Sequence, residues 1–186
     1  MQFLPEFQIG WLNGWIYFVF YLGVFGLTLR TCSPEVRRRL YDRSLWNRKT
    51  RNITALGKSF SLANIIMILF GRLQIGHVEF LIGTILYAAG LALLVVSIIH
   101  YRDAPLDQPI TKGVYKYSRN PQMVSIYILF AGMSLTLGAW LNLLFLGVAV
   151  LCSHFSILGE EKALLEQYGE SYEHYKEQVP RYFVFF

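Results

Sequence analysis

Cysteine and acidic residues are scarce in this chain of 186 residues. Its two cysteines, Cys32 and Cys152, have no metal-like spacing and do not favour a disulfide, so we expect buried free thiols and no bound metal. The first ten residues contain no Lys or Arg, and no small-residue cleavage site follows Leu29, so no cleavable signal peptide is expected. Internal repeats and low-complexity segments are also missing.

Long apolar blocks are abundant instead. Hydrophobic residues make up 54% of the chain and the mean hydropathy is +0.39. The blocks are about 15 to 20 residues long, the length needed to cross the hydrocarbon core of a bilayer. The sequence therefore predicts one all-α domain, residues 1–186, that forms a polytopic membrane protein with about five transmembrane helices. These cover residues 11–29, 60–75, 80–99, 121–137 and 141–158, and the second, with Asn64 and Arg72, is the weakest.

The basic residues indicate a topology. Nine lie in the connection 30–58, four in the loop 100–120 and three after residue 159, whereas only Arg72 lies in an expected outside loop. Basic loops stay in the cytoplasm, so we expect the N-terminus outside and the C-terminus in the cytoplasm. We interpret the connection 30–58 as a solvated run of charge beside anionic headgroups of the membrane lipid bilayer. The net charge of +5 then gives no indication of a nucleic-acid partner.

The last two apolar blocks predict an antiparallel helical hairpin with a tight turn near Gly138. From Gly159 onward the chain is charged, and its apolar residues recur every three or four positions. This spacing predicts cytosolic amphipathic helices at the interface, interrupted at Gly169.

A polar motif, residues 113–123, opens the hairpin with the sequence Gly-Val-Tyr-Lys-Tyr-Ser-Arg-Asn-Pro-Gln-Met. Asn120 is a good N-cap and Pro121 a good first helical residue, which explains the pair by local structure alone. The same helix N-terminus can bind an anion such as a ligand carboxylate, and Arg119 would strengthen that site. The alternative for Arg119 is an interfacial snorkelling role.

Two carboxylates, Glu160 and Glu161, follow the expected last span. Acidic groups are unfavourable at a helix C-terminus, so they need either a basic neighbour such as Lys162 or a ligand cation. A hairpin brings them to the face that carries Asn120. An anion site and two carboxylates together suit a zwitterion such as the amino-acid end of S-adenosylmethionine.

Other residues are candidates for the functional site, but each also has a purely structural explanation. His154 lies inside the last span, where an ionisable side chain is either functional or a hydrogen-bonded packing residue. Tyrosines near both clusters can stack on an adenine or a cation, or pack at the interface. They are Tyr115, Tyr117, Tyr168, Tyr172 and Tyr175.

The motif 113–121, the hairpin and the stretch from Glu160 to Arg181 together resemble the isoprenylcysteine carboxyl methyltransferase family, and phospholipid methyltransferases share the broader pattern. The resemblance covers about residues 107–182, while the first 100 residues agree only in hydropathy. It implies N-terminal spans over residues 1–100, followed over residues 101–186 by a cofactor-binding loop, the hairpin and C-terminal helices. It also implies methyl transfer from S-adenosylmethionine to a lipophilic small-molecule or lipidated acceptor that enters from the bilayer.

The resemblance also implies site residues. Tyr115 matches a cofactor-contacting tyrosine, and Glu160 and Glu161 match an acidic pair that holds the cofactor. Asn120, Pro121, Gln122 and Met123 match the segment that wraps the cofactor, and the stretch ending at Ile110 matches the upstream lining. The catalytic candidates are Arg119 and His154.

Two departures concern the acceptor. Eukaryotic members have Arg-His-Pro where this chain has Arg119-Asn120-Pro121, and Asn carries no charge. A family arginine on the last span is missing, so either His154 substitutes for it or the acceptor is not a carboxylate. The two rival readings are a membrane sterol-reductase-like enzyme that uses NADPH and a non-catalytic membrane scaffold. Small residues on the helices would also permit a homodimer.

Overall fold

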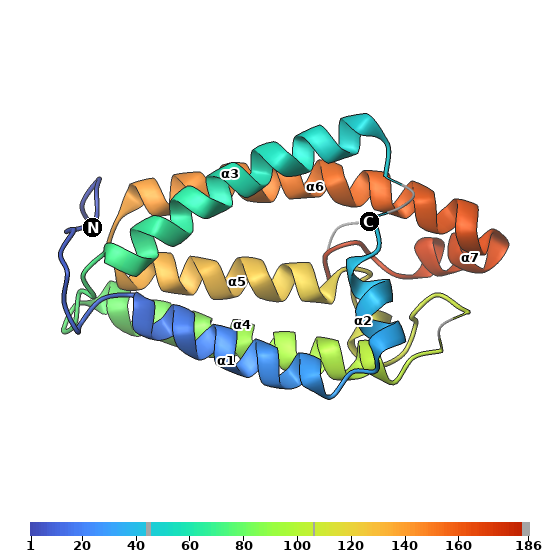
Figure 1. The fold of residues 1–186 in the computed structure, drawn as a ribbon, viewed down its shortest axis with the longest axis horizontal. Coiled ribbons are helices and arrows are strands. Elements are labelled where there is room, and N and C mark those ends of the chain that lie inside the picture. Colours follow the sequence, from blue (N-terminus) through green and yellow to red (C-terminus); the bar gives the residue numbers. More distant parts are fainter. Residues whose placement is uncertain (44–45, 106, 184–186) are drawn as a thin grey trace.

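A computed structural model describes residues 1–43, 46–105 and 107–183 as a bundle of helices (Figure 1). The five apolar helices are α1 (Trp15–Arg30), α3 (Arg48–Phe70), α4 (Val78–Arg102), α5 (Pro121–Thr136) and α6 (Trp140–Tyr168). The shorter elements are α2 (Pro34–Tyr41), the 3-10 helix η1 (Gly113–Lys116) and α7 (Glu170–Gln178). Among the described residues, β-structure is limited to isolated β-bridges, so the all-α prediction is confirmed.

Each of the five predicted apolar segments contains a helix. Three of them, α3, α4 and α6, are long and apolar enough to cross a membrane. The other two, α1 and α5, are apolar but have 16 residues each, less than the roughly 20 that a perpendicular span needs. The protein is therefore an all-α membrane protein, and a count of five crossings stays a prediction.

The bounds predicted for the second span, residues 60–75, were wrong. Helix α3 begins twelve residues earlier because Asn47 caps it, accepting a hydrogen bond from the backbone N–H of Thr50 at 2.8 Å. The amide nitrogen of Asn64, one of the two polar residues that weakened the pattern, has partners within the bundle, whereas its buried Oδ1 has none among the described residues. Asn64 is buried and donates to Ser134 Oγ at 3.1 Å and to the carbonyl oxygen of Asn142 at 2.8 Å. A sequence window cannot show these partners on α5 and α6.

The connection 30–58 is also not a simple solvated run, because it contains α2 and the beginning of α3. Ser33 caps α2 by accepting from the N–H of Val36 at 3.3 Å, and Pro34 is its first residue. Val36 and Cys32 are buried in the main core. This short basic helix is consequently fixed against the bundle.

The last span was predicted to end at Leu158, but the helix that contains it is longer. Helix α6 continues without a break to Tyr168 and ends where Gly169 has a φ of 54°, in the left-handed region that favours glycine. The predicted interruption at Gly169 is thus confirmed. Glu160 and Glu161 lie inside a helix, so the unfavourable C-terminal dipole does not explain why they need partners.

The helices pack as two layers. Helix α4 packs mainly on α5, with α1 beside α4, and α3 packs mainly on α6. In Figure 1 α5 lies between the α1–α4 layer and the α3–α6 layer. The turn at Gly138 (φ 63°) joins α5 and α6 as the predicted antiparallel hairpin, yet each of the two packs more closely on another helix. This arrangement leaves space between the layers at one end.

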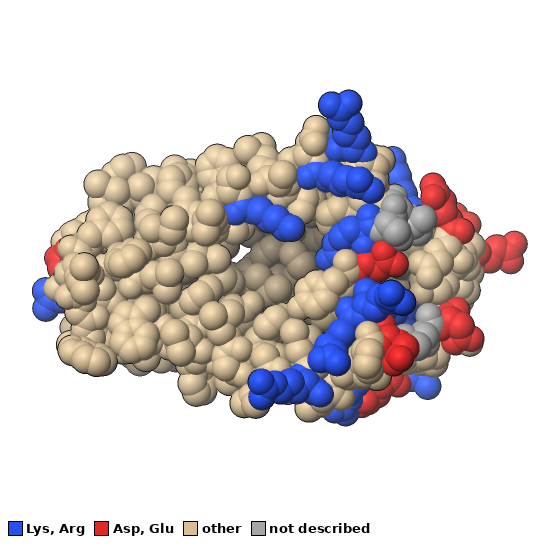
Figure 2. All heavy atoms as spheres, viewed as in Figure 1, with Lys and Arg blue, Asp and Glu red and all other residues tan. Residues whose placement is uncertain are grey.

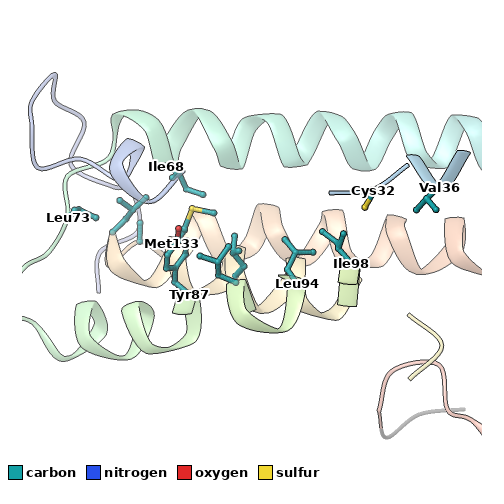
Figure 3. Packing of buried hydrophobic residues seen from close by; sticks show 12 residues of the cluster. Cys32, Val36, Ile68, Leu73, Tyr87, Leu94, Ile98 and Met133 are labelled. Carbon is teal, nitrogen blue, oxygen red and sulfur yellow. The ribbon is translucent and has the colours of Figure 1, made fainter. Parts of the chain in front are cut away.

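The core lies largely between α4 and α5, where side chains from several helices converge (Figure 3). Glycines allow the two backbones to approach closely. A Cβ on Gly132 would lie 2.6 Å from the carbonyl oxygen of Gly83 and 2.8 Å from the Cα of Tyr87. Close approach through small residues is a common way for membrane helices to associate.

We expect Gly132→Ala to destabilise the protein by about 1–3 kcal/mol, because backbone atoms surround the added methyl group and cannot move aside cheaply. The matched control is Gly23→Ala, where no atom lies within 4 Å of the added carbon. The control gains helix propensity and should not lower stability. Thermal unfolding in a neutral detergent compares them, and equal melting temperatures would contradict the close packing.

Charge is distributed unequally along the bundle. Figure 2 shows Lys and Arg gathered toward one end of the molecule, with acidic side chains beyond them. We call this the basic end; it includes Arg30, Arg48 and Arg102 at helix termini. At the opposite end, the N-terminal segment crosses the helix connections, and Gln2 donates its backbone N–H to Gly138 at 2.7 Å. The space between the layers opens at the basic end.

Candidate active site

A cavity of about 860 Å³ lies at the basic end between the two layers. The face seen in Figure 2 is hollowed beside a group of basic side chains. One part of the lining is apolar and comes from four helices: Phe25, Leu94, Ile126 and Ile157. The remaining lining residues include charged, amide and aromatic side chains, and they come from α2 and the residues after it, the end of α4, the loop before α5, the start of α5, the second half of α6, and α7. The four apolar residues named first are called the apolar end of the cavity.

The loop before α5 is held from both sides. Gly113 has a φ of 62° and lies against the ring of His100, whose Nδ1 accepts from the N–H of Val114 at 3.3 Å. Tyr115 is buried, and its carbonyl oxygen accepts from the hydroxyl of Tyr175 at 2.8 Å. Burial raises the pKa of the Tyr115 hydroxyl well above its usual value, so it is a neutral phenol in the cavity wall.

Helix α5 begins in the cavity wall with Pro121 as its first residue. Asn120 occupies the capping position, but its side chain makes no capping hydrogen bond, so the purely local explanation of this residue fails. Gln122 is the second polar group of this turn. Its side-chain amide interacts with the hydroxyl of Tyr115. Its buried Nε2, however, has no hydrogen-bond acceptor among the described residues. Two side-chain amides are thus available to a ligand, and Met123 lies beside them in the lining.

The two acidic residues have different surroundings. Glu161 is buried between two arginines: its Oε1 lies 3.0 Å from an Arg119 amino group, and its Oε2 lies 2.8 Å from an Arg181 amino group. The hydrogen bond to Glu161 raises the pKa of the Arg181 guanidinium, which stays charged. Glu161 therefore already has counter-charges from within the chain.

Arg119 is a structural residue rather than an exposed anion ligand. Its side chain is 2% exposed and donates to the carbonyl oxygens of Lys176 at 2.6 Å and Val179 at 2.8 Å, in addition to Glu161. Its backbone N–H donates to the carbonyl oxygen of Pro180 at 2.9 Å. These bonds fasten the chain after α7 to the segment before α5, which explains why an arginine is needed here.

Glu160 is the available carboxylate. It lines the cavity, and across the part of the chain that the structure describes it forms no hydrogen bond or salt bridge. Arg43, on the other side of the cavity lining, is the basic residue whose charge acts on it. A half-buried carboxylate without a hydrogen-bond donor is costly, which makes it a natural partner for a cation.

The structure brings most of the predicted site residues to one cavity. Those in its lining are Ile110, Tyr115, Arg119, Asn120, Pro121, Gln122, Met123, Glu160 and Glu161. His154 is not in the lining, and its Nδ1 lies 3.0 Å from the hydroxyl of Tyr182. Among the candidate tyrosines Tyr115, Tyr168, Tyr172 and Tyr175 reach the cavity, whereas Tyr117 is exposed elsewhere.

Sequence reasoning missed the contribution of α2. Arg39 donates to the carbonyl oxygens of Pro105 and Gln108, each at 2.7 Å, and lies over the ring of Tyr101 at 5.5 Å. A signal was present in the sequence: Ser33-Pro34 is a helix start, and an apolar residue recurs four positions after Val36. That pattern predicts a short amphipathic helix within the basic run.

The fold is that of a helical membrane protein with a cavity at its basic end. Residues 71–171, more than half of the chain, match the phospholipid methyltransferase family, and the chain belongs to this family. It is also 37% identical over 73 residues to the protein-S-isoprenylcysteine O-methyltransferase of Schizosaccharomyces pombe. That match covers 38% of this chain and 30% of the relative's length. The family indicates a methyltransferase.

Proposed function

We propose that this protein transfers a methyl group from S-adenosylmethionine to a lipophilic acceptor at the cytoplasmic face of a membrane. The observation that carries the proposal is a pair of polar groups without hydrogen-bond partners among the described residues of one cavity, the carboxylate of Glu160 and the buried Nε2 of Gln122. They come from opposite helices of the hairpin and from motifs inside the matched region.

The unused groups fit a zwitterionic cofactor. Glu160 would take its ammonium group, while Asn120, Gln122 and the free N–H groups of the first turn of α5 would take its carboxylate. The aromatic rings of Tyr115 and Tyr168 offer faces for the adenine. When bound, the cofactor supplies an electrophilic methyl group together with its own leaving group.

The residues of the chain mainly supply proximity and orientation, the usual protein contribution to such a displacement. The apolar end of the cavity, with Phe25 and Ile126, suits a hydrocarbon chain of the acceptor, such as an isoprenylcysteine-like compound or a lipid. A carboxylate acceptor needs no general base. An amine acceptor must lose a proton first, and Glu160 is the group in the cavity that can accept it.

The orientation and assembly are part of the proposal. The basic end faces the cytoplasm because basic residues are retained on that side. The N-terminus then lies outside, and the described C-terminal helix α7 lies at the cytoplasmic surface. The single domain, the lipid bilayer as surroundings, the homodimer and the absence of a nucleic-acid partner stay predictions.

Calorimetry on the purified protein in neutral detergent tests the proposal. We expect S-adenosylmethionine to bind with a roughly micromolar dissociation constant and NADPH to show no binding. NADPH binding without S-adenosylmethionine binding would favour the sterol-reductase-like enzyme. A folded protein that binds neither would favour the scaffold, and either result would overturn the methyltransferase proposal.

A further inference from the structure

Helix α2 lies outside the region that matches the family, yet it forms one wall of the cavity. Its position is fixed by the burial of Val36 in the core and by Arg39, which binds the carbonyl oxygens of Pro105 and Gln108. Arg39 also reaches the hydroxyl of Tyr168 at 3.2 Å, so its donors are used within the fold. The backbone of α2, and with it that of Arg38, is therefore fixed beside the cavity, and Arg43 follows two residues after the end of this helix.

Two arginines of the lining, Arg38 and Arg43, form no salt bridge with a carboxylate within the described ranges, although the charge of Arg43 acts on Glu160. Arg38 lines the cavity and makes no hydrogen bond or salt bridge with any residue in the described ranges. Arg43 also lines it; it lies over the Trp46 ring at 4.7 Å and donates to the carbonyl oxygens of Leu40 and Asp42. Both guanidinium groups have remaining N–H donors, and their planar fork matches carboxylate and phosphate oxygens.

The charge balance of the cavity favours an anion. Four arginines and four acidic residues occur among the described lining residues. Arg181 adds a further positive charge through its salt bridge with Glu161. The proposed cofactor brings an ammonium and a sulfonium against one carboxylate, which makes the loaded cavity more positive still. In a partly desolvated site such an excess is unfavourable unless a second ligand brings negative charge.

We infer that Arg38 and Arg43, which lie outside the matched region of the chain, form a recognition site for the acidic headgroup of the acceptor. Its carboxylate or phosphate group would bind these two arginines. Its hydrocarbon chain would lie along the apolar end, which includes Leu94 and Ile157. The inference rests on the proposed function, since it assigns the second ligand of the same cavity, and it makes α2 and the residues just after it the segment that selects the acceptor.

Equilibrium binding of four probes with one tail length tests the inference: dodecanoate, dodecyl phosphate, dodecanol and dodecylammonium. They are titrated by calorimetry into the full chain in neutral detergent with saturating S-adenosylmethionine. We expect the two anions to bind at least about tenfold more tightly than the alcohol or the amine, the effect of one charge-assisted hydrogen bond. The double variant Arg38→Gln/Arg43→Gln should lose this preference and keep its affinity for dodecanol.

The matched control is Arg37→Gln, an exposed arginine of α2 that does not line the cavity. It should keep the preference. An equal loss of the anion preference in the control would show a general attraction of anions to the basic surface. An unchanged preference in the double variant would show that the anion binds elsewhere. Either result overturns the inference, and so does a wild type that shows no preference for anions. Competition by inorganic phosphate alone at similar concentration would show a headgroup-only site and also contradict an amphiphile.

The proposed function can fail separately. Binding of S-adenosylmethionine is measured in the absence of every probe, for the wild type and for both variants. If the wild type does not bind the cofactor but keeps an arginine-dependent preference for anions without it, the methyltransferase proposal fails and the anion site stands.

Discussion

Replacing Glu161 by alanine is expected to lower the apparent melting temperature by about 10 °C, which corresponds to about 3–5 kcal/mol for a buried ion pair that loses one partner. The reason is the position of Arg119, whose guanidinium is almost fully buried and would keep its charge without a carboxylate. Arg181 would lose its salt bridge with Glu161 too. The segment before α5 and the chain after α7 would then be held together by the remaining hydrogen bonds, among them those from Arg119 to the carbonyl oxygens of Lys176 and Val179.

Scanning fluorimetry of the detergent-purified protein measures this change. The matched control is Glu160→Ala, one residue earlier, which removes the same group from a position without a salt bridge in the described structure. It should melt within about 2 °C of the wild type, the range of a substitution that breaks no network. Equal melting of the two variants would contradict the buried cluster of Glu161 with its two arginines.

Replacing Glu160 by glutamine should weaken S-adenosylmethionine binding about 30-fold or more, the usual contribution of one hydrogen bond between charged groups. Glutamine keeps the size of the side chain and its ability to accept a hydrogen bond, so the loss reports the negative charge. Stability should not fall, because removing a half-buried charge without a donor relieves a desolvation cost. Calorimetry with the folded variant measures the affinity.

The control for this variant is Glu35→Gln, which changes an exposed carboxylate of the same cavity lining. Its charge is screened by solvent, so the cofactor affinity should change by less than about threefold. Similar losses in both variants would show that the overall charge of the cavity matters rather than Glu160. An unchanged affinity in Glu160→Gln would remove Glu160 from the proposed cofactor site.

The meeting of the two polar clusters could be predicted from the sequence. Two apolar segments of similar length joined by a turn at Gly138 return the chain to the level where it started, so Asn120 and Glu160 lie at the same end. The prediction depended only on segment lengths and on the positions of the turns. It therefore succeeded even though the bounds of α3 and α6 were misplaced.

The different roles of the two carboxylates could not be predicted in this way. The basic partners that distinguish them come from Arg119, before α5, and from Arg181, after α7. No periodicity within α6 contains that information. The surroundings of His154 could not be predicted either, because its side chain lies against Tyr182 and does not line the cavity. Tertiary contacts between distant segments decided each of these cases.

The salt bridge between Glu161 and Arg181 also sets the order in which the site is assembled during synthesis. Domains and membrane segments form as the chain emerges, N-terminal parts first. All five apolar helices precede Arg181 in the chain, so they leave the ribosome before the residue that completes the cluster around Glu161. Glu161 and Arg119 can pair with each other once α6 has formed, whereas the salt bridge from Glu161 to Arg181 must wait for the segment after α7. The cavity acquires its final charge only when the segment after α7 folds back onto α6.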